Sequence, residues 1–153
     1  MDPSSETKDS ASVERVIPAT PEAIFALIAD PSRHHEIDGS GTVRDAKDMP
    51  ATLELGAKFG MSMKLGVRYS TVSTVIEYEP GRRLAWQTYP TVGGRLAGGR
   101  IWRYELEQVE GGTRVRETWD ISQERVKAIV RPARARSIES MTKTLERIEQ
   151  ILA

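Results

Sequence analysis

One apolar stripe near the C-terminal end most constrains how this chain can fold. The segment from Pro132 to Leu152 is predicted to be a helix of roughly 30 Å, at about 1.5 Å per residue. Its apolar residues recur at spacings of three and four and so share one face: Ile138, Met141, Leu145, Ile148 and Leu152. Glu139 and Lys143, on another face, are spaced for an ion pair. A lone amphipathic helix must cover another element, and we expect that element to be a sheet.

The chain ahead of the sheet predicts one strand and two short helices. Ser12–Ile17 alternates loosely between apolar and polar residues, as a short strand does. Thr20 suits an N-cap position, and the following segment, Pro21–Ala29, is predicted to be an amphipathic helix that begins with proline. Asp30-Pro31 ends that helix, and Asp30 or the serine after Pro31 is expected to cap a second short helix over Ser32–Ile37.

Strands dominate the middle of the chain, because side chains there alternate with a period of two. The predicted strands are Thr42–Ala46, Phe59–Leu65, Tyr69–Glu79, Leu84–Thr88, Arg100–Glu107 and Val115–Ile121. Gly111-Gly112 is the strongest hairpin signal, since paired glycines accept the positive φ of a tight turn. A short helix is expected over Gln123–Val130. The predicted fold is α+β: a curled antiparallel sheet of about seven strands around a long C-terminal helix, in one domain over residues 12–153.

Composition narrows the classes of function. The 153 residues carry 22 Lys and Arg against 22 Asp and Glu, so no general attraction to nucleic acid is expected. The chain has no cysteine, which excludes disulfides and thiolate chemistry and fits a cytoplasmic protein. No apolar run is long enough for stable membrane insertion. Residues 1–11 are predicted to be a loose tail without signal-peptide character, and we expect a monomer or weak homodimer.

Three stretches resemble one known family: Ile17–Pro31, Glu79–Leu84 and Gly112–Ser122 with the helix that follows. They resemble the helix-grip fold of START-related (SRPBCC) proteins, and most closely their polyketide cyclase/dehydrase and lipid-transport branch. The resemblance implies a cavity between sheet and final helix for a lipid, a polyketide or another hydrophobic molecule. It implies no universal catalytic residue. Many relatives carry an aromatic residue soon after the Asp-Pro, where this chain has His34-His35.

Alternation places a candidate ligand-binding wall on the face of the sheet toward the helix. It comprises Phe59, Met61, Trp86, Arg100, Trp102, Tyr104, Glu117, Trp119, Met141 and Leu145. An Arg and a Glu on an aromatic wall suit a ligand site, and a buried carboxyl suits acid–base chemistry. Glu117, Tyr104 and Arg100 are therefore the candidate catalytic residues, and we expect Arg100 and Tyr104 to be the partners of Glu117. The alternative is that Arg100 lies at the rim and Glu117 pairs structurally.

Three other groups have both a functional and a structural interpretation. His34, His35, Glu36 and Asp38 could bind a metal, but adjacent histidines on a helix diverge, and exposed histidines on a solvated helix are the more usual meaning. The basic run of Arg125, Lys127, Arg131, Arg134 and Arg136 could meet an anion or RNA, although a solvated face is commoner. Met61, Met63 and Met141 could adapt to ligands or simply fill the core.

The leading hypothesis is binding of a small hydrophobic ligand, lipid or polyketide-like, with neither cofactor nor metal. The alternative is a polyketide aromatase/cyclase or dehydratase that uses the same cavity. A third possibility is a filled fold that acts through partner contacts. The volume of the interior cavity separates the third from the first two, since ligand sites need roughly 300 Å³ or more.

Overall fold

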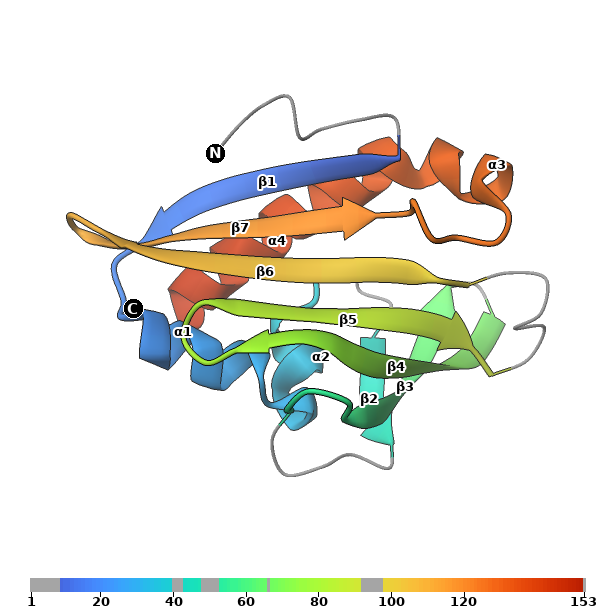
Figure 1. The fold of residues 1–153 in the computed structure, drawn as a ribbon, viewed down its shortest axis with the longest axis horizontal. Coiled ribbons are helices and arrows are strands. Elements are labelled where there is room, and N and C mark those ends of the chain that lie inside the picture. Colours follow the sequence, from blue (N-terminus) through green and yellow to red (C-terminus); the bar gives the residue numbers. More distant parts are fainter. Residues whose placement is uncertain (1–8, 40–42, 48–52, 66, 92–97, 153) are drawn as a thin grey trace.

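The fold is a computed structural model that describes residues 9–39, 43–47, 53–65, 67–91 and 98–152 (Figure 1). The helices and strands, in chain order, are β1 (Ser10–Ile17), α1 (Pro21–Ile28), η2 (Pro31–Arg33), α2 (His34–Ile37), β2 (Val43–Lys47), β3 (Lys58–Leu65), β4 (Val67–Glu79), β5 (Arg83–Pro90), β6 (Arg100–Val109), β7 (Gly112–Asp120), α3 (Lys127–Val130), η3 (Arg131–Ala133) and α4 (Arg134–Leu152). The predicted α+β helix-grip fold, with two short helices between the first two strands, is confirmed.

The strands form one antiparallel sheet in the order β1-β7-β6-β5-β4-β3-β2. Strands β2 to β7 follow one another as neighbours, and β1 joins the far edge by pairing with β7. The predicted hairpin turn is present: Val109 pairs with Gly112, and Gly111 has a φ of 90°. Gly112, at φ 146°, lies so close to the end of β1 that a Cβ there would approach the Ile17 carbonyl oxygen to 2.0 Å. The glycine pair therefore shapes the turn and lets β1 pass.

The short helices begin where the caps predict. The Thr20 hydroxyl accepts a hydrogen bond of 3.1 Å from the Ala23 N–H, and Pro21 is the first residue of α1. The Asp30 carboxylate accepts one of 3.0 Å from the Ser32 N–H. The second helix differs from the single one predicted, because it begins as a 3₁₀ turn that follows Asp30 directly and becomes α-helical only at His34. Side-chain acceptance of orphan N–H groups stabilises both starts.

Helix α4 packs along the inner face of β1 and β7 and runs behind these strands in Figure 1. Its buried apolar residues are Met141, Leu145 and Ile148, whereas Ile138 and Leu152, at the ends of the predicted stripe, are half-buried. The helix begins at Arg134, because the predicted start, Pro132, lies in the 3₁₀ turn η3. Glu139 and Lys143 form the expected ion pair at 3.1 Å.

Two boundaries predicted from sequence were wrong. Strand β1 begins at Ser10 rather than Ser12, and Ala11 is fully buried opposite Trp119. Residues 10 and 11 therefore belong to the sheet and not to the tail. Helix α3 begins at Lys127, not Gln123, and only Val130 of its three spaced apolar residues is buried. The segment is too short to bury a full stripe.

The core consists of two clusters of buried side chains on the inner face of the sheet. The larger lies under α1, α2 and the C-terminal half of α4, and includes Leu84, Val115, Leu145 and Ile148. The smaller surrounds Trp119 and includes Ile121, Val130 and Met141. The outer face instead carries ion pairs, such as Arg103 with Glu77 at 2.7 Å. This division positions the wall predicted from sequence on the side of the sheet toward the helices.

Candidate functional site

Three tryptophans form a row across neighbouring strands. Trp86 of β5 lies directly opposite Trp102 of β6, and Trp102 lies opposite Trp119 of β7. Directly opposed residues in antiparallel strands project to the same face of the sheet. Trp119 is fully buried, whereas Trp86 and Trp102 each keep part of their surface exposed. The row therefore runs from one fully buried indole ring to two that are partly exposed.

Aromatic rings from three elements surround Trp86. The His34 ring of α2 stacks on it, with ring centres 5.1 Å apart and an angle of 20°. Phe59 of β3 meets Trp86 edge-on at 5.5 Å, and Tyr104 of β6 lies 5.8 Å away. Phe59 and Tyr104 are buried. Stacked and edge-on rings at such separations attract one another beyond simple area burial. The middle of the inner face is thus a pre-formed aromatic wall.

His34 is part of this wall, although the sequence pattern did not place it there. The side chain is buried, and its Nε2–H donates a hydrogen bond of 2.8 Å to the Ile28 carbonyl oxygen. Burial lowers the pKa of the imidazole, and this hydrogen bond acts against that shift. The available signal was the family preference for an aromatic residue just after the Asp-Pro, because a neutral imidazole is itself an aromatic ring.

Glu117 is a buried carboxyl group at the centre of the inner face. It lies on β7 directly opposite Tyr104, whose hydroxyl is within hydrogen-bonding reach of the carboxyl group. The Glu117 Oε1 atom has no hydrogen-bond partner among the described residues. A buried polar atom without a partner costs about 1–3 kcal/mol. Glu117 therefore has spare hydrogen-bonding capacity toward the interior.

The electrostatics of this pair favour an uncharged interior. Burial raises the pKa of the Glu117 carboxyl well above its usual range, the Tyr104 hydroxyl opposes that shift, and the negative charge of Asp38 adds to it. Burial, followed by the charge of Glu117, also raises the pKa of the Tyr104 phenol. Desolvation disfavours the charged form of each group. Burial therefore favours the protonated O–H form of both groups.

Arg100 lies at the start of β6, and its carboxylate partner is not Glu117. Its Nε is 3.5 Å from the Glu124 carboxylate, whose other oxygen accepts a hydrogen bond of 3.0 Å from the Gly98 N–H. Burial lowers the pKa of the Arg100 guanidinium, and the charge of Glu124 acts against the shift. The expectation that Arg100 pairs with Glu117 was wrong, because the register of β6 and β7 places Glu117 opposite Tyr104, whereas Arg100, at the start of β6, lies beside Glu124.

The predicted wall divides between the two core clusters. The larger cluster contains or borders five of its residues: Phe59, Met61, Tyr104, Leu145 and Trp86. The smaller contains or borders three: Trp119, Met141 and Trp102. Trp86, which borders the larger cluster, and Trp102, which borders the smaller one, are opposite each other on β5 and β6 and so connect the two clusters. The side chain of Met63 lies outside the described part of the structure.

The other candidates lie apart from the wall. His35 is exposed, and the Glu36 carboxylate accepts a hydrogen bond of 3.0 Å from Arg33 Nε. Exposure of both histidines was the more usual expectation, and it is wrong for His34, which the aromatic cluster buries. Within the described ranges, no three His, Cys, Asp or Glu side chains are placed to hold a metal ion. The basic run begins at Arg125, just before α3, and continues through α3 and η3 to Arg136 in α4.

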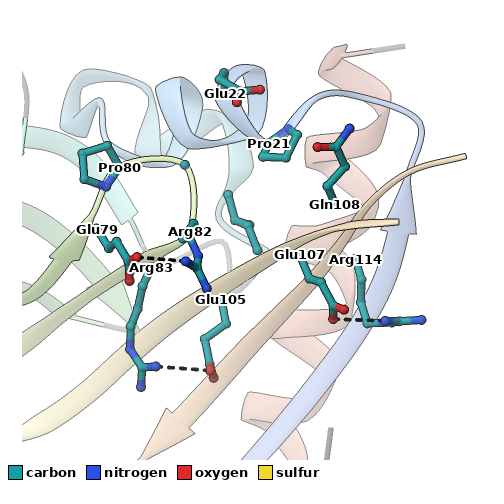
Figure 2. Close-up of a pocket in the computed structure, with 12 residues that line it drawn as sticks. Pro21, Glu22, Glu79, Pro80, Arg82, Arg83, Glu105, Glu107, Gln108 and Arg114 are labelled. Carbon is teal, nitrogen blue, oxygen red and sulfur yellow. Dashed lines mark hydrogen bonds and ion pairs between the residues drawn. The ribbon is translucent and has the colours of Figure 1, made fainter. Parts of the chain in front are cut away.

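A surface groove of about 680 Å³ lies at the end of the sheet near the β4–β5 turn (Figure 2). Its lining is charged, with ion pairs of Glu79 with Arg82 at 3.2 Å and Glu107 with Arg114 at 3.2 Å. Ligand pockets of this volume are usually lined by apolar and aromatic side chains. None of the ten wall residues borders the groove. The groove is therefore separate from the candidate site.

A long C-terminal helix against a curled antiparallel sheet, with short helices between the first two strands, defines a helix-grip protein of the SRPBCC class. The chain belongs to the family described as "Polyketide cyclase / dehydrase and lipid transport", which it matches over residues 8–152. The family resemblance expected from the sequence is confirmed.

The chain is similar to a curated relative in sequence and to solved structures in fold. An uncharacterised protein of Mycobacterium tuberculosis is 42% identical over 113 residues, which make up 72% of this chain and 46% of that protein. The chain thus spans about half the length of the curated relatives it matches. A crystal structure of a Chromobacterium violaceum protein superposes with a TM-score of 0.73 at 14% identity, over 95% of this chain and 98% of that one.

A third similar structure is DynU16, a protein in the dynemicin biosynthetic locus. Its TM-score is 0.63 at 17% identity, over 94% of this chain and 47% of DynU16. At such identities the two structural likenesses establish the fold alone. In the part of the chain that the structure describes, no helix has both the length and the apolarity to cross a membrane.

Proposed function

We propose that the protein binds a small hydrophobic ligand, lipid or polyketide-like, against the inner face of the sheet beside α4. The tryptophan row carries this proposal. Trp86 and Trp102 remain partly exposed on a face that is otherwise packed core, and partly exposed aromatic rings give an apolar ligand a surface to pack against. Membership of a family described by polyketide cyclisation and lipid transport supports the same class of ligand.

The Glu117–Tyr104 pair, whose burial favours the protonated form of both groups, supports a ligand that carries a few oxygen atoms. A protonated carboxyl donates one hydrogen bond and accepts others, so it matches a ketone or hydroxyl group inside an apolar site. Trp119 Nε1, two residues along β7, is a buried donor that likewise has no partner among the described residues. Apolar walls with a few placed polar groups are typical of ligand sites. An oxygenated apolar molecule therefore suits this face better than a pure hydrocarbon.

The test is a titration of intrinsic tryptophan fluorescence, supported by calorimetry. The ligand panel contains dodecanoic acid, 1-naphthol and, as its deoxygenated match, naphthalene. We expect saturable changes, with 1-naphthol bound more tightly than naphthalene by about tenfold, which one hydrogen bond to a buried group supplies. No saturable signal from any of the three would contradict the proposal.

Two variants localise the site. Trp102→Ala removes a half-buried ring from the row and should weaken 1-naphthol binding by about tenfold or more, because the ligand then has no indole ring to pack against at this position. Val72→Ser is the matched control, because Val72 is exposed on the same sheet but follows and precedes residues that point inward, Thr71 and Ser73. It should leave affinity unchanged. Equal losses of affinity in both variants would place the ligand elsewhere.

A second candidate function is catalysis, and the same Glu117–Tyr104 pair favours it. In an aldol cyclisation of a poly-β-ketone, a protonated Glu117 would donate its proton to a carbonyl oxygen as the enol carbon bonds to that carbonyl carbon. The proton lost from the enol passes to water and restores the acid. Loss of the new hydroxyl with an adjacent proton, as water, would complete an aromatase or dehydratase reaction.

Glu117→Gln separates the two functions. With a linear 1,3,5-triketone as substrate, a catalytic Glu117 predicts near-normal binding and loss of cyclised product, measured by mass spectrometry. The amide keeps the shape of the side chain and cannot donate a carboxylic proton. If the protein is a binder only, wild type yields no cyclised product above a buffer control. In that case the substitution should mainly change stability, by about 1–3 kcal/mol.

A further inference from the structure

The segment around α3 exposes apolar side chains at one end of the molecule, opposite the β4–β5 turn (Figure 1). Ile129 is 70% exposed, the highest value of any large apolar residue in the described ranges, and Val126 is 36% exposed. The next residue, Val130, is buried in the cluster that contains Trp119 and Met141. Successive helical residues point about 100° apart. Burial of Val130 thus anchors α3 and turns Ile129 outward.

Cationic residues flank these two apolar residues along the chain. Together they form what we term the α3 surface: Arg125, Val126, Lys127, Ile129, Arg131, Arg134 and Arg136. The one acidic residue in this stretch, Glu124, is 2% exposed and turned inward to Gly98 and Arg100. The whole chain has 22 cationic and 22 anionic residues, so the excess of cationic residues between positions 124 and 136 is a local feature of this segment.

Two contacts help to hold these cations in place. Arg131 Nε lies 2.9 Å from the Asp9 carboxylate, which offsets part of its charge. The Arg125 guanidinium lies 5.0 Å from the centre of the Tyr89 ring, within the range of a cation–π contact. Tyr89 is the one aromatic residue that the described structure shows in contact with the basic run, and Arg125 covers part of its ring. The surface therefore presents aliphatic groups and cations, but no free stacking ring among the described residues.

We propose that the α3 surface docks the protein reversibly on an anionic membrane. Ile129 and Val126 enter the boundary between headgroups and acyl chains, and the surrounding arginines and Lys127 contact lipid phosphates. Apolar residues rimmed by cations are characteristic of elements that lie in this interface. Single-stranded RNA is the less suitable partner, because it offers no apolar environment for the exposed aliphatic side chains of Val126 and Ile129, whereas the acyl boundary of a membrane does.

The test measures partition of the intact protein onto vesicles by co-sedimentation. Vesicles of phosphatidylcholine alone are compared with vesicles that also contain phosphatidylglycerol, at low and at physiological salt. We expect binding to the anionic vesicles that weakens with salt. Lys127→Gln should lower the partition coefficient by about fivefold, the contribution of one cation near the surface. Ile129→Ser should lower it by about tenfold, through loss of inserted apolar area.

The chain offers matched controls for both variants. Leu55, at 66% exposure, is nearly as exposed as Ile129 but lies in the turn before β3, and Arg82 is an exposed cation on the β4–β5 turn. Leu55→Ser and Arg82→Gln should bind vesicles like wild type. Thermal midpoints for all four variants establish that each is folded.

Three results would overturn the proposal. The first is no preference for anionic vesicles, and the second is a loss of partition in Leu55→Ser equal to that in Ile129→Ser. The third is salt-sensitive binding to polyuridylic acid that Lys127→Gln weakens, without any binding to vesicles. That third outcome would assign the α3 surface to RNA instead.

Discussion

Tyr104 and Glu117 lie directly opposite each other on β6 and β7, buried on the inner face with the phenol and carboxyl in reach of one another. In other proteins buried carboxylates commonly meet an arginine, but here Arg100 pairs with Glu124. Glu117 is therefore held by a neutral hydroxyl in an apolar environment. Its protonation state then links the site to the stability of the fold.

The stability of the protein should depend on pH through Glu117. Its folded pKa is raised above the ordinary 4.5, so above about pH 4.5 the unfolded chain ionises while the folded carboxyl keeps its proton. Stability relative to Glu117→Gln should fall by about 1.4 kcal/mol per pH unit until the folded pKa is reached. Urea unfolding between pH 4 and 8 measures the difference. The Tyr104 hydroxyl lowers the pKa of Glu117, so Tyr104→Phe should extend this loss of stability to higher pH. If the difference in stability between wild type and Glu117→Gln did not change with pH, Glu117 would not be a buried acid with a raised pKa.

His34 should give the opposite dependence. Its folded pKa lies below the ordinary 6.5, so its contribution is complete above pH 6.5 and is lost as the pH falls toward the folded pKa. Relative to His34→Phe, wild type should lose up to about 1.4 kcal/mol per pH unit below 6.5. The exposed neighbour His35 supplies the control, because His35→Gln leaves the buried imidazole in place and should retain the loss. If the stability of His34→Phe fell with decreasing pH as steeply as that of wild type, a group other than His34 would cause the pH dependence.

Leu145→Ala tests the packing of α4. Leu145 is 1% exposed in the larger cluster, and removal of its side chain should cost about 2–5 kcal/mol in free energy of unfolding. Lys143→Ala, two residues away on the solvent side, breaks only the exposed pair with Glu139 and should cost about 0.5 kcal/mol or less. Chemical denaturation of both variants provides the comparison. Equal midpoints would mean that the α4 face is not buried in solution.

Glu124 should hold the start of β6 against the segment after β7. Its carboxylate accepts the Gly98 N–H, and the Gly98 carbonyl accepts the Arg125 N–H at 3.0 Å. Glu124→Ala should cost about 1–3 kcal/mol, because the Gly98 N–H would remain buried without its acceptor. Hydrogen exchange at Gly98 should accelerate in this variant and stay slow in Gln123→Ala, a change at an exposed side chain. Unchanged exchange in Glu124→Ala would mean that the carboxylate does not hold this junction.

The sequence by itself determined the local elements and the direction in which most side chains point. Thr20 and Asp30 cap the first helices because a cap depends only on residues two or three positions away. Glu117 could be assigned to the inner face because alternation along a strand has a period of two. The stripe on α4 follows from helical periodicity in the same way.

Only the tertiary structure decided which side chains meet. The register between β6 and β7 places Tyr104 rather than Arg100 opposite Glu117, and one shift of that register would have changed the partner. His34 is buried because α2 folds against Phe59 and Trp86, which are distant in sequence. Ile129 is exposed because α3 is too short to bury more than Val130. Such contacts join elements far apart in the chain, so no local pattern encodes them.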